Sequence, residues 1–153
     1  MTAVAHRSVG ASIVVGAAPA TVFELLADPR RHAEFDGSGT VRSAVDGPPR
    51  LGPGARFGMA MRWGVPYRIG NTVVEFEEGR RIAWRHFGRH VWRYELDADN
   101  GGTRITETFD YAPALSPRLL ELTDTPRRNL ASIQATLNRL VTLLGPAEPV
   151  APR

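Results

Sequence analysis

The sequence predicts an α+β fold in which a curved, seven-stranded antiparallel sheet wraps around one long C-terminal helix, with two short helices after the first strand. Two observations lead to this prediction. The segment from Pro126 to Leu144 has apolar residues at helical spacing, and the segment from Thr40 to Tyr111 alternates apolar and polar residues between tight turns. A lone amphipathic helix needs a surface to lie on, which a curved sheet supplies.

The C-terminal helix is the best-defined element. Thr125 is expected as its N-cap, with Pro126 in the first turn, and Gly145-Pro146 ends it. Its wide apolar stripe consists of Leu130, Ile133, Leu137, Leu140, Val141 and Leu144. A sheet that grips one helix often leaves a hollow between the two layers, so the predicted fold is a container.

The N-terminal part predicts one strand and two short helices. The β-branched residues within Val9 to Gly16 favour a strand. A helix opens at Ala18-Pro19-Ala20 and ends at Asp28, because a residue that precedes proline disfavours the helical conformation. Arg30 to Phe35 is expected to form a second, shorter helical turn.

Six further strands follow, each bounded by turn residues. They are Thr40–Val45, Arg56–Trp63, Tyr67–Phe76, Arg81–His86, Val91–Asp97 and Thr103–Tyr111. Asp99-Asn100-Gly101-Gly102 is the strongest hairpin motif of the chain. A short helix capped by Ser116 leads into the long one.

Length and composition indicate one globular domain. We expect it to span residues 9–145 of the 153, with flexible tails at 1–8 and 146–153. No apolar run approaches the ~20 residues needed to cross a bilayer, so no stable membrane insertion is expected. The absence of cysteine excludes disulfides and fits a cytoplasmic location, and the chain is expected to be a monomer or a homodimer.

The charge pattern argues against nucleic-acid binding. All 19 basic residues are arginine, yet the net charge is only +3 and the arginines are scattered along the chain. Nucleic-acid binding requires a concentrated basic face, with stacking aromatics where single strands are bound. We therefore expect no nucleic-acid partner.

Three segments resemble a known superfamily. SIVVGAAPATVFELLADPRRHAEFD resembles its first strand and helix pair, VVEFEEGRRIAWR its fourth and fifth strands, and GGTRITETFDY its last strand. The chain thus resembles the helix-grip domains of the START-like, or SRPBCC, superfamily, which includes the polyketide cyclase/dehydrase group and lipid-transfer domains. The resemblance implies the fold over nearly the whole chain, but fold alone does not fix function.

Alternation along the strands predicts which side chains face the helix. The candidates for a ligand pocket are Met59, Met61, Trp63, Trp84, Trp92, Tyr94, Phe109 and Tyr111 on the strands, with Leu130, Ile133 and Leu137 on the helix. Arg68 shares the parity of Val74, which is also expected to face inward, unless Gly70 marks a bulge. Large aromatic and thioether side chains suit a hydrophobic small-molecule ligand, although a solid core would use the same residues.

Two polar residues on the inward faces are candidate catalytic groups. Glu107 lies between Ile105 and Phe109, so burial should raise its pKa toward that of a general acid-base; the alternative is an arginine partner or a place at the rim. His86 shares a face with Trp84 and is a candidate proton carrier or hydrogen-bonding group.

Other chemistries lack their motifs. His86 and His90 have the spacing of a helical metal pair, but Gly88 and the strand pattern place them across a turn, so no metal site is expected. The sequence has neither a phosphate-binding loop nor a dinucleotide-binding motif, and no cofactor is expected. Two functions remain open: a carrier of a hydrophobic or aromatic molecule, and a polyketide cyclase, aromatase or dehydratase.

Overall fold

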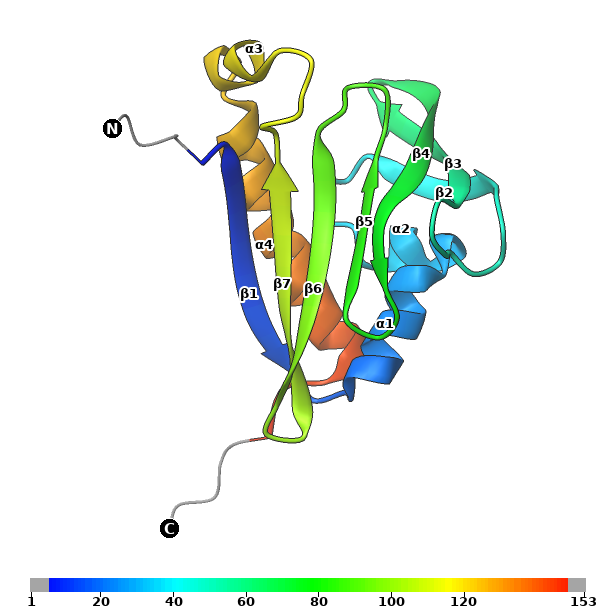
Figure 1. Ribbon diagram of the computed structural model, residues 1–153, viewed down its shortest axis with the longest axis vertical. Coiled ribbons are helices and arrows are strands. Elements are labelled where there is room, and N and C mark those ends of the chain that lie inside the picture. The colour runs from blue at the N-terminus through cyan, green and yellow to red at the C-terminus, as the bar shows by residue number, and fades with distance from the viewer. Residues whose placement is uncertain (1–5, 149–153) are drawn as a thin grey trace.

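A computed structural model describes residues 6–148 and shows, within that range, one sheet of seven strands (Figure 1). The strands are antiparallel in the order β1-β7-β6-β5-β4-β3-β2. Their bounds are β1 Ser8–Val15, β2 Val41–Asp46, β3 Arg56–Trp63, β4 Val65–Glu77, β5 Arg81–Arg85, β6 Val91–Asp99 and β7 Gly102–Asp110. Each strand lies within a few residues of its predicted position.

The helices also follow the predicted order. They are α1 Pro19–Ala27, the 3₁₀ turn η1 Pro29–Arg31, α2 His32–Phe35, α3 Pro117–Leu122 and α4 Thr125–Leu144. Figure 1 shows α4 crossing behind the sheet, with α1 and α2 on the same side. The predicted helix-grip fold is confirmed. No helix within residues 6–148 is both long and apolar enough to span a membrane.

Two details at the ends of elements differ from the prediction. The N-cap of α4 is Asp124, in the left-handed conformation at φ 59°, so Thr125 already lies in the first turn. The ordered fold also extends beyond residues 9–145, because the Tyr111 amide donates to the Arg7 carbonyl and Pro146 bridges to Val15. Residues 1–5 and 149–153 of the expected tails lie outside the described residues.

A bulge in β4 reverses the parity expected for that strand. The pairing of β4 with β5 shifts register between Val73 and Glu75, so Val73 is buried whereas Val74 is 39% exposed. Phe76, beyond the bulge, packs edge-on against Phe23 with ring centroids 5.5 Å apart. The prediction that Arg68 and Val74 face inward was therefore wrong, because the odd-numbered residues face the helix before the bulge.

The long helix covers only one half of the sheet. It packs mainly against β1 and β7, the first two strands in the sheet order. Ile133, Leu137 and Leu140 of its apolar stripe are buried there, and Leu130 is half-buried. The strands β2–β6 form the rest of the sheet, beyond the half on which α4 mainly packs.

A glycine fixes the end of α2 against α4. The Gly37 amide donates a 2.8 Å hydrogen bond to the hydroxyl of the buried Thr136. A Cβ atom at Gly37 would lie 2.5 Å from the Thr136 backbone nitrogen and 2.6 Å from the Ala135 Cβ. Only glycine allows this approach, which closes one side of the space between helix and sheet.

The Gly37→Ala variant is expected to lower the free energy of unfolding by about 1–3 kcal/mol, because overpacking displaces α2 from α4. Urea denaturation followed by circular dichroism measures this change. Gly52→Ala is the matched control, since a Cβ atom there meets no atom within 4 Å. Equal denaturation midpoints for the two variants would show that the close approach is not a constraint.

Candidate functional site

A cavity of about 610 Å³ lies between the sheet and α4. It includes Phe87, His90 and His86 from the β5–β6 loop, His32, Phe35 and Asp36 from α2 and its end, and Ser38, Thr40 and Val41 leading into β2. The sheet contributes Phe57, Met59, Met61, Trp63, Tyr67, Ile69, Asn71, Trp84, Trp92, Tyr94 and Glu107, and the helix contributes Thr125, Arg128, Asn129, Ser132, Ile133 and Thr136. The hollow expected between the sheet and the long helix is therefore present.

The inner wall is a cluster of stacked rings. His32 lies flat on Trp84, with ring centroids 4.8 Å apart and an interplanar angle of 19°. Phe57 meets Trp84 edge-on at 5.7 Å, and Tyr94 lies 5.6 Å from it. The His32 Nε2 lies 2.8 Å from the Leu26 carbonyl oxygen, which fixes the tautomer with Nε2 protonated. Burial lowers the pKa of His32 to about 4, so this ring is neutral at neutral pH.

The helix wall is polar. Thr125, Arg128, Asn129, Ser132 and Thr136 follow one another at helical spacing and all line the cavity. The sequence analysis considered only the apolar stripe of α4 and therefore missed this second stripe. The same three-and-four spacing, applied to polar residues, would have predicted it. A ligand in the cavity thus meets aromatic rings on the sheet side and hydrogen-bonding groups on the helix side.

Glu107 brings a carboxyl group into this cavity. It is 4% exposed on β7, opposite Tyr94 of β6, and the Tyr94 hydroxyl donates a 2.9 Å hydrogen bond to its Oε1. Among the described residues, its buried Oε2 atom has no hydrogen-bond partner. The inward orientation expected from alternation is therefore observed, and no arginine pairs with the carboxyl within the described chain.

Burial controls the ionisation of this group. It raises the pKa of Glu107 to about 8; the hydrogen bond from Tyr94 opposes the rise, and the charge of Asp36 adds to it. The pKa of Tyr94 is raised well above its usual value, first by burial and then by Glu107. At neutral pH the carboxyl is therefore mainly protonated. Since Oε1 accepts from Tyr94, the proton is assigned to Oε2, the oxygen that has no partner among the described residues.

The two histidines of the β5–β6 loop meet across Gly88. The rings of His86 and His90 are 4.1 Å apart, and the Gly88 amide donates a 3.3 Å hydrogen bond to the His86 Nδ1. Burial lowers the pKa of both rings, that of His90 to about 4, where the neighbouring His86 adds to the effect. Within residues 6–148, no group of three or more potential metal ligands is assembled.

Most of the predicted site residues border the cavity, and five do not. Those that line it are Met59, Met61, Trp63, Trp84, His86, Trp92, Tyr94, Glu107 and Ile133. Phe109, Tyr111 and Leu137 belong to the core, and neither they nor the half-buried Leu130 line the cavity; Phe109 is fully buried, with its ring centroid 4.8 Å from that of Trp92. These four and Arg68 thus do not border this cavity, and the binding and catalytic roles of all the predicted residues stay predictions.

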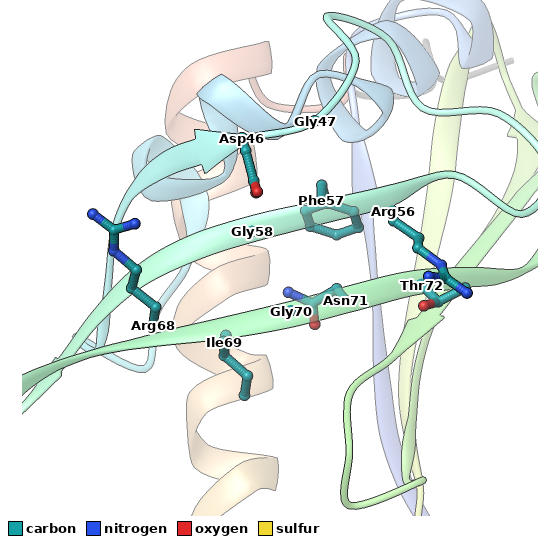
Figure 2. A pocket seen from close by; sticks show the side chains of 10 residues that line it. All are labelled: Asp46, Gly47, Arg56, Phe57, Gly58, Arg68, Ile69, Gly70, Asn71 and Thr72. Atoms are coloured by element: carbon teal, nitrogen blue, oxygen red, sulfur yellow. The ribbon is translucent and has the colours of Figure 1, made fainter.

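Arg68 lies on the opposite face of the sheet. It borders a shallow groove across β2, β3 and β4, where Gly58 and Gly70 are register partners without side chains. Figure 2 shows Arg68 and Arg56 toward the two ends of this groove, with Asp46 projecting toward the glycines. At the two glycines the groove exposes backbone, and exposed charges border it; Phe57, Ile69 and Asn71 line both this groove and the cavity.

The further lining residues that the sequence analysis missed include His32, Asp36, Asn71 and His90. His32 and Asp36 come from the short helical segment, where no periodicity indicates a direction. The bulge in β4 hid the buried Asn71, because it reverses the parity on which the prediction for that strand rested.

Two proteins of Mycobacterium tuberculosis match most of the chain. It is 41% identical over 138 residues to the uncharacterized protein Rv0088 of Mycobacterium tuberculosis strain H37Rv, covering 86% of this chain and 62% of that protein. The uncharacterized protein MT0096 of strain CDC 1551 matches with the same identity and coverage. The chain thus spans about three fifths of the length of these curated relatives.

Solved structures share the fold at low sequence identity. Protein CV1439 of Chromobacterium violaceum superposes with a TM-score of 0.70 at 18% identity, covering 92% of this chain and 98% of that one. Protein Ms6760 of Mycobacterium smegmatis gives a TM-score of 0.66 at 18% identity and 91% coverage of each chain. The model of the family described as polyketide cyclase/dehydrase and lipid transport matches residues 6–145. With that match over nearly its whole length and the superfamily resemblance confirmed, this chain belongs to the polyketide cyclase/dehydrase and lipid transport family.

Proposed function

We propose that the protein binds an apolar, mainly aromatic small molecule that carries at least one hydrogen-bonding oxygen, and that it acts as a carrier or sequestering protein. One observation carries this proposal. The Oε2 atom of Glu107 is buried at the wall of the cavity with no partner among the described residues. A buried polar atom without a partner destabilises a protein, and a ligand oxygen would relieve that penalty.

The dimensions and walls of the cavity support a ligand of this class. Its volume of about 610 Å³ lies within the range of pockets for drug-sized molecules. Burial of apolar surface contributes roughly 25 cal/mol per Å². A ligand that buries about 300 Å² of such surface would gain enough for micromolar affinity.

The polar groups define the orientation of the ligand. The protonated Oε2 of Glu107 donates a hydrogen bond, so it would select a carbonyl or hydroxyl oxygen. On the helix side, Asn129 and Ser132 offer further donors and acceptors. The ligand that fits best has a flat apolar face toward Trp84 and oxygen atoms along another edge. The cytoplasmic location and the monomeric or homodimeric state stay predictions.

A second function is favoured by the same carboxyl group. With a pKa of about 8, Glu107 exchanges a proton readily near neutral pH, which suits a general acid-base. In a cyclase or dehydratase, it would remove a proton from a carbon beside a carbonyl or give one to a departing hydroxyl group. The ring wall would hold a flexible chain in one fold during this step.

Ligand binding is expected to quench or shift tryptophan fluorescence, since Trp63, Trp84 and Trp92 all line the cavity. Titration with anilinonaphthalene sulfonate and with a panel of aromatic and fatty ligands measures the affinity. The Ser132→Phe variant fills part of the cavity and should weaken binding by about tenfold or more. Gln134→Phe adds the same ring on the exposed face of α4 and should leave the affinity unchanged. Equal affinities for both variants would place the ligand elsewhere.

The Glu107→Gln variant separates the two functions. It keeps the size and hydrogen bonding of the side chain and removes the ionisable proton. In an enzyme, turnover of any panel ligand, followed by mass spectrometry, should fall by about 10²–10⁴ while affinity stays within a few fold. In a carrier, the parent protein leaves every bound ligand chemically unchanged. Unchanged turnover in the variant would remove Glu107 from the chemistry.

The contribution of Glu107 to stability should decrease as the pH rises from about 4.5 to about 8. In this window the folded protein retains the Glu107 proton while the unfolded chain has lost it, so deprotonation favours unfolding. The lowered pKa values of His32 and His90 act in the opposite direction below about pH 6.5, so the comparison with Glu107→Gln isolates the carboxyl. Glu107→Gln should therefore be more stable than the parent above pH 8, by a few kcal/mol, and the difference should shrink toward pH 4.5. Urea denaturation across the pH range measures it. The control is Asp97→Asn, which removes an exposed carboxyl group from β6 and should leave the dependence of stability on pH as it is in the parent.

A further inference from the structure

Exposed apolar side chains gather at one end of the molecule. Within residues 6–148, nine large hydrophobic residues are exposed, and seven of them lie on the β3–β4 hairpin, the β5–β6 loop, and the segment from Leu115 through α3. They are Trp63, Val65, Tyr67, Phe87, Leu115, Leu119 and Leu122, of which Trp63, Phe87 and Leu122 are 73%, 82% and 84% exposed. We refer to these seven residues as the rim.

Part of the rim borders the cavity. Figure 1 shows α3, the β5–β6 loop and the β3–β4 hairpin at the same, upper end of the molecule. The Leu115 amide donates a hydrogen bond to the Gly88 carbonyl, which joins two of these segments. Trp63, Tyr67 and Phe87 also line the cavity. The exposed apolar surface is therefore continuous with the apolar interior.

The same end carries arginines without carboxylate partners. Arg62, Arg85, Arg89, Arg118 and Arg128 form no ion pair with any described residue. The nearby acidic residues are already paired, Glu121 with Arg7 and Asp124 with Arg127.

At the opposite end of the sheet the arginines are paired: Arg50 with Glu24 and Glu78, Arg80 with Glu77, Arg81 with Glu95, and Arg104 with Asp99. The end that carries the rim thus holds five unpaired arginines beside exposed apolar side chains, while further arginines without an ion pair to any described residue, Arg42, Arg56, Arg68 and Arg139, lie on β2, β3, β4 and α4.

We propose that the rim docks reversibly onto the surface of a bilayer that contains anionic phospholipid. Aromatic and leucine side chains enter the boundary between headgroups and acyl chains, while arginines beside them bind phosphate groups. Exposed apolar side chains interspersed with arginine are the composition that such a boundary accommodates. The absence of a membrane-spanning helix in the described chain is consistent with this peripheral mode.

The charge pattern selects a bilayer over a second copy of this chain. A symmetric dimer through the rim would bring the two sets of unpaired arginines against each other, which opposes association. An anionic bilayer offers negatively charged headgroups for the arginines and, directly beneath them, a hydrocarbon region for the apolar side chains. If the proposed carrier function holds, docking lets an apolar ligand move between bilayer and cavity without crossing water. The docking itself does not depend on that function.

Vesicle flotation tests the docking with the whole protein and no added ligand. The protein should float with vesicles of phosphatidylcholine mixed with phosphatidylglycerol, and far less with phosphatidylcholine alone. High salt should release it, because the interaction between exposed charges is screened. Failure to float with the mixed vesicles would overturn the proposal, as would equal, salt-insensitive flotation with both kinds. Fluorescence titration without vesicles tests ligand binding in the cavity separately. Failure of one proposal can therefore be distinguished from failure of the other.

Matched variants assign the docking to the rim. The double variants Arg62→Gln/Arg118→Gln and Leu119→Ser/Leu122→Ser each alter residues outside the cavity, and each should lower the vesicle partition coefficient by about tenfold or more. The control variants Arg56→Gln and Leu143→Ser, exposed away from the rim, should bind as the parent does. An equal loss in the controls would overturn the assignment. Self-association of the parent in sedimentation velocity that Leu119→Ser/Leu122→Ser abolishes would also overturn the assignment, because the rim would then bind a second copy of this chain.

Discussion

The two-sided character of α4 is the constraint on which the rest of the structure depends. Ile133, Leu137 and Leu140 pack on the β1–β7 half of the sheet, while Asn129 and Ser132 point to the other half. Packing that polar side directly on aromatic strands would bury hydrogen-bonding groups without partners, which is costly. The helix therefore closes half of the sheet and stands away from the remainder. An interior of close-packed side chains is the normal state of a protein, so a space of this size reflects the sequence of the helix more than loose packing.

The chemistry of the cavity follows from the same geometry. Glu107 lies on β7 between the buried Ile105 and Phe109, at the strand where helix contact gives way to open space. With no arginine within reach among the described residues, the group avoids a buried charge by keeping its proton. His32 likewise stays neutral against Trp84. The ring wall and Glu107 thus contain ionisable side chains that are uncharged at neutral pH, so this part of the cavity suits an apolar ligand while offering a proton.

Alternation along the strands predicted the sheet and the inward orientation of Glu107, because both depend only on local periodicity. It failed at Arg68 and Val74, because the bulge after Val73 is set by the pairing with β5 and leaves no mark in the pattern of apolar residues. It also could not separate core from cavity: Phe109 and Trp92 share one face of the sheet, and only the position of α4 decides that the first is sealed and the second borders the space. His32 was missed because a single helical turn has too few residues to indicate a face.

Stabilising and destabilising features lie at opposite ends of the molecule. At the closed end, Gly102 fits against the Val15 carbonyl where no side chain has room, and Pro146 bridges to the same strand. At the cavity end, α3 has no buried side chain, and its Glu121 is held to the body by an ion pair with Arg7 that is about two-fifths exposed. Exposed ion pairs contribute at most about 1 kcal/mol, so α3 is a segment of low local stability. A carrier and an enzyme both require a route by which a ligand enters an interior walled by rings, and a weakly held helix beside the opening supplies one. Such a route suits the proposed carrier and is needed by the alternative enzyme as well, so the difference between the two functions rests on what the Glu107 proton does once the ligand is inside.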